Sequence, residues 1–397
     1  MELFTYDVEV DGTNIAGMTL TGATITYGAT TTGQPPQPTV AFLELLTVDA
    51  FGDFAVDYPG ISWNGGILSG FVDTYKDQYQ GASSSLKVGK PVTIKISTTS
   101  GFVDTYIDDY SAGYDSTRFT GQIASLDYTP GLIGITAVDA AEALSRTTLD
   151  TSEWPAETET DRVDRILTAA GVTGQIYSTG STMLRPGAHM DGKATPWQHL
   201  IRTAISCGSV AWVNRTGVVS YRSDPVVDDY YVAPPEATLV DPLKMSSEIG
   251  DVINTITVKY GDKLETTATN TASATAYGPR HASIQTELDS ETDAAAFGAS
   301  YVASEYPGRG EPAWHMQNSS LHLGLASDPN EVANLLDADI DDVMTLPYLL
   351  PASPTPNYSA RIIGYQESLD PFDWVIQYVL DPYGWDQGAS ESLRSIT

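Results

Sequence analysis

The sequence predicts a mainly β protein with smaller α+β parts, built around two related β-barrel units. Strand-forming residues are plentiful, with 22 Tyr against 9 Phe, and 34 Gly and 23 Pro provide frequent turns. A ten-residue strand segment in the first half recurs near the C-terminus. Apolar residues at helical spacing occur in the middle of the chain, at 149–240, and again over 290–306. A length of 397 residues is compatible with two to four domains.

The changes in pattern along the chain predict three parts. The first is a β-barrel with two loop insertions, the second is a small α+β domain of two helices and a hairpin, and the third is a second β-barrel interrupted by an α+β insertion. The predicted ranges are 1–148 with insertions at 47–90 and 98–117, then 149–240, then 241–397 with its insertion at about 266–334.

Strand signals dominate the first part. Asp11-Gly12 is a two-residue hairpin turn. Apolar and polar residues alternate through 91–97, as in a half-buried strand. Residues 39–46 (TVAFLELL) are apolar on both faces, which is typical of a strand covered on two sides. Residues 132–138 predict the last strand of this part.

Helix signals define the middle part. A first helix is predicted to follow the cap residue Thr158 and to end at Gly171. A second is predicted from the cap residue Thr195 to Gly208, with proline at its first position. Residues 209–222 then predict a β-hairpin.

The third part returns to strands. Residues 255–260 alternate in polarity, and so do residues 374–380 after the strand segment 360–365. The polar stretch 263–275 predicts a loop. An alanine-rich helix is predicted over 290–306.

The repeated segment aligns without gaps at an offset of 243. RFTGQIASLD at 118–127 and RIIGYQESLD at 361–370 are identical at five of ten positions, and a proline follows each. The glycine permits a sharp bend in a barrel strand. Chance similarity is the alternative to a true duplication. The positions singled out are Arg118, Gly121 and Asp127, matched by Arg361, Gly364 and Asp370.

A second repeat, SGFVDTY, occurs at 69–75 and at 100–106, and each copy continues to a further tyrosine. Aromatic residues dominate the anchors of protein interfaces, so the two copies are candidate docking loops. A local duplication, or two strand ends packed together, explains the repeat equally simply. The candidate interface residues are Phe71, Tyr75, Tyr79, Phe102, Tyr106 and Tyr110.

The charge balance excludes tight binding to the DNA backbone. The chain has 20 Lys and Arg against 51 Asp and Glu, and no basic run. Such an excess of acid is most simply a solubility charge. Alternatively, it forms an acidic wall along which DNA slides without binding.

No enzyme signature is present. The sequence lacks a Walker loop, a dinucleotide-binding glycine pattern, a Gly-x-Ser-x-Gly elbow, Cys-x-x-Cys and His-Glu-x-x-His. The five histidines have no metal-ligand spacing, and Cys207 lies in an apolar helix. The acidic run 337–342 is interpreted as a solvated strand edge. We therefore expect no catalysis and no cofactor.

The N-terminus has neither a basic region nor an apolar core, so no secretory signal is expected, and no apolar run reaches the ~18 residues of a membrane span. We expect synthesis and folding in a reducing cytoplasm.

The order of these parts resembles that of the baseplate hub proteins, or minor tail proteins, of long-tailed bacteriophages, in particular phages of actinobacteria. The likeness lies in LLDADIDDV at 335–343, in RIIGYQE at 361–367 followed by Trp374 and Leu380-Asp381-Pro382, and in INTITVKYG at 253–261.

This resemblance implies a homotrimer at the tip of the tail tube. Two barrels in each of three chains would form a pseudo-sixfold torus that adapts the sixfold tube to a threefold tip and surrounds the DNA passage. The implied partners are further copies of the chain, distal tail or tail tube proteins, the tape measure protein, and tail fibre or other tip proteins. The implied location is the virion.

Two other functions stay open. A receptor-binding or carbohydrate-binding tail protein would use the aromatic loops to contact sugars. An enzyme acting on cell-wall glycans would need paired carboxylates, which 51 acidic residues cannot single out.

Overall fold

A computed structural model describes most of the chain. The described residues are 4–15, 20–30, 37–46, 86–98, 115–129, 132–178, 180–187, 193–222, 230–233, 244–247, 249–303, 312, 315–317, 319–322, 335, 337–347, 357–369 and 374–384.

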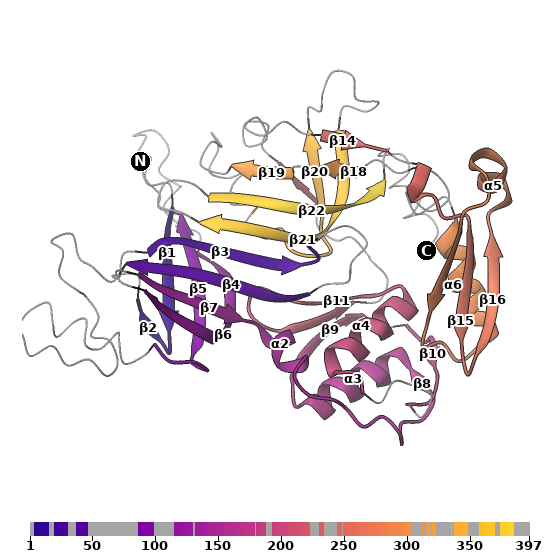
Figure 1. Cartoon of the computed structure of the whole chain (residues 1–397), viewed down its shortest axis with the longest axis horizontal. Helices are drawn as coiled ribbons and strands as arrows, with labels where there is room; N and C mark the ends of the chain where they lie inside the picture. Colours follow the sequence, from indigo (N-terminus) through magenta and orange to yellow (C-terminus); the bar gives the residue numbers. More distant parts are fainter. Residues whose placement is uncertain are drawn as a thin grey trace, which may run out of the picture.

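Strands account for most of the described elements (Figure 1). The strands of the large sheet are β1 (Phe4–Val10), β2 (Thr13–Asn14), β3 (Leu20–Gly28), β4 (Gln37–Leu46), β5 (Pro91–Thr98), β6 (Asp115–Thr129), β7 (Leu132–Val138), β13 (Tyr230–Val232), β19 (Ser319–His322), β20 (Val343–Pro347), β21 (Asn357–Leu369) and β22 (Trp374–Gly384).

Shorter strands and the helices complete the chain. They are α2 (Ala140–Leu144), β8 (Glu157–Thr158), α3 (Glu159–Ala170), β9 (Gly174–Ser178), β10 (Met183–Leu184), α4 (Pro196–Cys207), β11 (Val210–Val213), β12 (Val219–Arg222), β14 (Lys244–Ser246), the 3-10 turn Ile249–Asp251, β15 (Thr255–Tyr260), β16 (Leu264–Thr269), α5 (Thr271–Tyr277), β17 (His281–Gln285), α6 (Glu291–Val302) and β18 (His315–Gln317).

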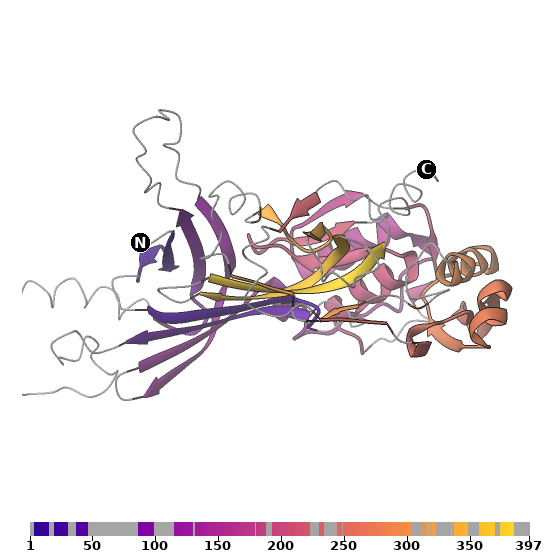
Figure 2. The ribbon, with the colours of Figure 1, turned by 90° about the horizontal axis from the view of Figure 1, so that it is seen from above.

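The mainly β class is confirmed, but the described strands form no closed barrel. Strands from both predicted units belong to one 12-stranded sheet, in the order β13-β20-β21-β3-β4-β7-β6-β5-β1-β2, with β22 beside β21 and β19 beside β22. Figure 2 shows the purple and yellow strands following one another along a single band. The two units are therefore joined edge to edge through the pairing of β3 with β21.

The two units contain the same run of three antiparallel strands. In the first unit β6 pairs with β5 along its N-terminal half and with β7 along its C-terminal half. In the second unit β21 pairs with β20 along its N-terminal half and with β22 along most of its length. The first copy, residues 118–127, lies within β6, and residues 361–369 of the second copy lie within β21. This shared order is compatible with the duplication, which stays a prediction.

The seam between the units depends on two glycines that face each other. Gly28 in β3 pairs with Gly364 in β21, and the Ala29 N–H donates to the Ile363 carbonyl oxygen at 2.9 Å. A Cβ atom on Gly364 would lie 2.1 Å from the Ala29 carbonyl oxygen. Gly121, the matching position in β6, would place a Cβ 2.3 Å from the Val138 carbonyl oxygen. Both glycines thus allow a close approach of neighbouring backbone.

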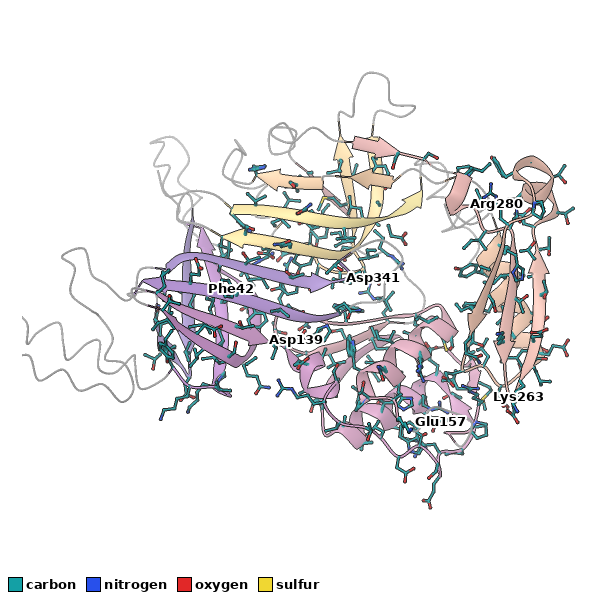
Figure 3. The ribbon with its side chains drawn as sticks, in the orientation of Figure 1. Phe42, Asp139, Glu157, Lys263, Arg280 and Asp341 are labelled. Carbon is teal, nitrogen blue, oxygen red and sulfur yellow. The ribbon has the colours of Figure 1, made fainter. Side chains whose placement is uncertain are left out.

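The prediction that residues 39–46 are covered on two faces is wrong for the described chain. Ala41, Leu43 and Leu45 are buried, whereas Val40 and Phe42 are 38% and 41% exposed. The outward side chains of β4 are therefore partly exposed to solvent, and Figure 3 labels Phe42 among them.

The two helices and the hairpin predicted for the middle part are present. Thr158 caps α3, and Gly171 ends it in the left-handed conformation. Thr195 and Gln198 form a full capping box on α4, which ends at Gly208. The hairpin of β11 and β12 follows, and β9 adds a third, parallel strand that the sequence pattern did not predict.

The prediction of a loop over 263–275 is wrong. Residues 264–269 form β16, which pairs antiparallel with β15, and α5 follows from the cap residue Asn270. β16 is an edge strand rich in threonine, and it lacks the alternating apolar residues by which a strand is usually predicted. Packed beneath this sheet, α6 confirms the helix predicted over 290–306, although it ends at Val302.

Asp139 joins the first unit to the α+β part (Figure 3). One carboxylate oxygen caps α2 through the Ala141 N–H at 2.9 Å, and the other accepts the Thr39 N–H of β4 at 2.9 Å. Burial raises the pKa of Asp139 from 3.8 to about 6.

Gly364→Ala should destabilise the fold strongly, because the new methyl group meets backbone that cannot move aside. We expect a loss of about 1–3 kcal/mol in the free energy of unfolding, measured by urea titration. Gly22→Ala at the same seam is the matched control, because its Cβ would lie at an ordinary 3.5 Å from the Leu369 carbonyl oxygen. Equal effects of the two substitutions would contradict the close approach at Gly364.

Asp139→Asn should change the pH dependence of stability. Because the folded pKa is raised, the contribution of Asp139 is fully present below pH 3.8 and is lost as the pH rises through about 6. The wild type should thus lose about 3 kcal/mol relative to the variant between pH 4 and 7. Unfolding titrations across this range measure the difference, and parallel profiles would refute it.

Candidate functional site

The structure places the predicted site residues unequally. The aromatic candidates Phe71, Tyr75, Tyr79, Phe102, Tyr106 and Tyr110 and the turn residue Asp370 lie outside the described residues. Asp127 is exposed near the end of β6. Gly364 lies at a shift in strand register, whereas the shift between β6 and β7 falls between Ile123 and Ser125, after Gly121. The two arginines do not share a role: Arg118 is fully buried, whereas the Arg361 side chain is 22% exposed.

Arg118 forms a buried ion pair with Glu367, and both side chains are 0% exposed. The Arg118 Nε donates to the two Glu367 carboxylate oxygens at 3.1 and 3.0 Å, and Nη2 donates to the same carboxylate. The guanidinium also lies 5.3 Å from the centre of the Trp374 ring. Both charges are therefore satisfied inside the core.

This pair requires the sheet to curl. Three strands, β7, β4 and β3, separate β6 from β21 in the sheet order. In a flat sheet four strand spacings would hold β6 and β21 about 19 Å apart. Direct contact between Arg118 and Glu367 means that the N-terminal half of β6 folds back over the core face of β21.

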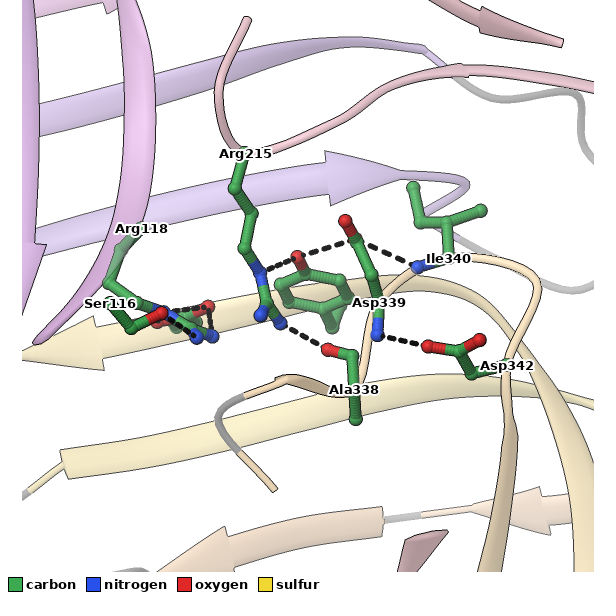
Figure 4. A network of polar contacts seen from close by, with 9 residues as sticks. Ser116, Arg118, Arg215, Ala338, Asp339, Ile340 and Asp342 are labelled. Atoms are coloured by element: carbon green, nitrogen blue, oxygen red, sulfur yellow. Dashed lines mark hydrogen bonds and ion pairs between the residues drawn. The ribbon is translucent and has the colours of Figure 1, made fainter. Parts of the chain in front are cut away.

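A second arginine enters the same core from the α+β part (Figure 4). Arg215, in the turn between β11 and β12, donates from Nε to the Tyr365 hydroxyl oxygen at 2.7 Å and from Nη2 to the Ala338 carbonyl oxygen. The Tyr365 hydroxyl in turn donates to Asp339 at 3.0 Å. One chain of hydrogen bonds thus connects the α+β part with β21 and with the segment before β20.

Tyrosine rings fill the space beside these arginines. Tyr27 of β3 stacks on Tyr365 of β21 with ring centres 4.5 Å apart, and Tyr378 of β22 lies 5.8 Å from Tyr365. Burial raises the pKa of Tyr27 and Tyr365 well above the ordinary tyrosine value. The rings therefore stay neutral and pack across the seam between the units.

The interpretation of the acidic run 337–342 as a solvated strand edge is wrong for Asp341. Its carboxylate is buried and lies 3.4 Å from Arg222 of the α+β part and 3.4 Å from Arg361 of β21. Burial raises the pKa of Asp341, and the two arginines oppose that shift. Asp341 thus joins its own segment to β12 and β21, and neighbouring residues in the sequence do not indicate such a contact.

The charges of Arg118, Glu367 and Asp341 are thus paired inside the core, where they hold strands together.

Within the described part of the chain, no three His, Cys, Asp or Glu side chains lie close enough together to bind a metal ion. No described helix is both long and apolar enough to cross a bilayer. A surface hollow of about 800 Å³ beside α4 is lined by residues of both charge signs, including Arg185, Lys263 and Glu287.

Sequence reasoning missed Glu367, Arg215 and Tyr365. A signal for Glu367 existed, because it lies between Tyr365 and Leu369 on the apolar side of an alternating strand. A charged residue at such a position needs a buried partner. The sequence could not identify that partner, which is 249 residues away.

Arg118→Met should cost about 3–5 kcal/mol in the free energy of unfolding, because Glu367 would be left as an unpaired buried charge. The double variant Arg118→Met with Glu367→Leu should recover most of this loss. Urea titration at a fixed protein concentration measures both.

The matched control is Lys95→Met, which removes an exposed pair with Glu9 and should cost less than about 1 kcal/mol. A single and a double variant of equal stability would show that Arg118 does not neutralise Glu367.

Comparisons with known proteins identify similar folds but assign the chain to no protein family. No protein-family model matches the chain, and no curated protein matches it in sequence. Solved structures do match it. A 43 kDa tail protein of prophage MuSo2 from Shewanella oneidensis is 12% identical, with a TM-score of 0.58, and the match covers 96% of this chain and 99% of that one. The tail protein from Neisseria meningitidis MC58 is 10% identical, with a TM-score of 0.57 and 98% of each chain covered.

Both matches extend over the strand units, the α+β part and the insertion together. The chain therefore has the fold of these two tail proteins along nearly its whole length.

Proposed function

We propose that the chain is a structural protein of a phage tail, a homotrimeric baseplate hub that surrounds the DNA passage and adapts a sixfold tube to a threefold tip. The observation that carries this proposal is one sheet shared by two strand units of the same order. The full-length likeness to two tail proteins supports the tail.

Two units in one chain suit a symmetry adaptor. A ring of three chains would present six strand units, and closed rings are the usual solution for repeated contacts between identical chains. The seam at Gly28 and Gly364 fixes the position of one unit against the other within each chain. A ring of such chains would then have a nearly sixfold arrangement on one face.

The matched buried charges support a structural role over a catalytic one. Arg118, Arg215 and Arg361 each contact an acidic or tyrosine side chain, or backbone, within the core. These contacts join the first unit, the α+β part and the second unit into a single body. A protein that transmits load along a tail needs such rigidity, and no step of a reaction follows from these contacts.

The partners follow from the position proposed. They are further copies of the chain, the distal tail or tail tube proteins, the tape measure protein, and tail fibre or other tip proteins. The proposed location is the virion, at the tail tip.

Native mass spectrometry of the purified chain tests the proposal. We expect a dominant species with three times the mass of the 42.5 kDa chain, persisting on dilution. A chain that stays monomeric or dimeric at every concentration, and that is absent from threefold complexes in purified particles, would refute the trimeric hub.

A further inference from the structure

We infer that a surface hollow beside α3 is a docking site for a basic peptide segment of a partner protein. The segment would present lysine or arginine side chains together with an apolar side chain. The described lining of this hollow belongs to α3, β8, β10 and the residues just before β8, and not to the shared sheet. The inference therefore goes beyond the proposed hub and does not depend on its trimer.

The hollow lies between α3 and the neighbouring short strands β8 and β10, at the lower right of Figure 1. Its volume is about 760 Å³, which is within the range of ligand sites. Residues 161, 164, 165, 168 and 169 of α3 line it, and their spacing of three and four places them on one side of the helix. The opposite side of α3 packs into the core through Val163, Ile166 and Leu167.

The hollow has an apolar lining that a partner side chain can contact. Five of its eleven lining residues are apolar: Trp154, Pro155, Ala156, Ala169 and Met183. Met183 is 38% exposed, and Trp154 is half-buried. Tryptophan is enriched among the residues that dominate binding energy, and methionine adapts to varied partner surfaces. An apolar side chain of the partner would therefore gain by leaving water here.

The charges of the lining favour a basic partner. Glu157 is buried and accepts hydrogen bonds from Arg162 Nε at 2.6 Å and from Arg165 Nε at 2.8 Å. Both guanidinium groups are thus engaged with Glu157. The exposed carboxylates of Asp161 and Asp164 are the charges that a ligand would meet. The chain's net charge of −31 would also attract a basic segment before contact.

The wall of the hollow is held in place by the rest of the α+β part. The Gly187 N–H donates to the Trp154 carbonyl oxygen at 2.9 Å, and the Trp154 N–H donates to the Thr151 carbonyl oxygen at 3.0 Å. Arg162 and Arg165 lie 5.8 and 5.9 Å from the centre of the Trp154 ring. A site that is already ordered costs a partner less on binding.

The hollow beside α4 is the weaker candidate for the same partner. Its lining holds four cations against three carboxylates, so it does not favour a basic segment. Two of its carboxylates, Asp262 and Glu265, are exposed and serve as a control in the test.

Fluorescence anisotropy with the full chain tests the inference. The probe is a fluorescein-labelled hexapeptide of alternating lysine and leucine, in about 150 mM salt to screen distant charges. We expect Asp161→Asn with Asp164→Asn to weaken binding by about tenfold or more, because the ligand loses both carboxylates while the shape is kept. Ala169→Lys should weaken binding as much, because it adds bulk and a positive charge to the lining.

Two controls separate this site from general attraction to an acidic surface. Asp262→Asn with Glu265→Gln changes the net charge by the same amount and should alter binding by less than about twofold. A hexapeptide of alternating lysine and serine should bind the wild type about tenfold more weakly, because it lacks the apolar side chains.

The inference is overturned if the probe does not bind, if the control pair weakens binding as much as the Asp161 and Asp164 pair, or if the serine peptide binds as tightly as the leucine peptide. It is also overturned if Ala169→Lys keeps the wild-type thermal midpoint but changes the mass of the assembly, because the hollow would then be a contact between copies of the chain. Failure of the proposed trimer is separate, since it appears in the mass of the unmodified chain.

Discussion

The buried ion pair between Arg118 and Glu367 is the contact on which the rest of the architecture depends. The pair can form only when β6 folds back over β21. It therefore favours the curled sheet and holds the first unit against the second. Two charges removed from water stabilise a fold little by themselves, since desolvation offsets their attraction. We propose that their value here is specificity, because an arrangement that separates β6 from β21 would leave each charge without this partner.

The same constraint explains why the α+β part is not a separate appendage. Arg215 and Arg222 reach from its hairpin into the junction, where they meet Tyr365 and Asp341. Asp139 connects α2 to β4. Segments distant in sequence therefore converge on β21 and its neighbours.

Local features were predictable from the sequence, and long-range ones were not. Thr195 and Gly208 delimit α4 because capping depends on residues within one turn. The mainly β class and the hairpin of β11 and β12 follow from composition and alternation. The strand β16 was missed because its pairing with β15, and not its own polarity, makes it a strand. The partner of Glu367 lies 249 residues away, and a periodic pattern does not encode such a contact. The same pattern does not show whether a second layer covers the apolar outward side of residues 39–46, which is partly exposed.

Electron microscopy of the purified assembly, with rotational averaging, tests the central claim most directly. The account predicts a ring with threefold symmetry in which six similar lobes surround an open centre, because each chain contributes two strand units. A twofold particle, or three lobes without a central opening, would contradict it.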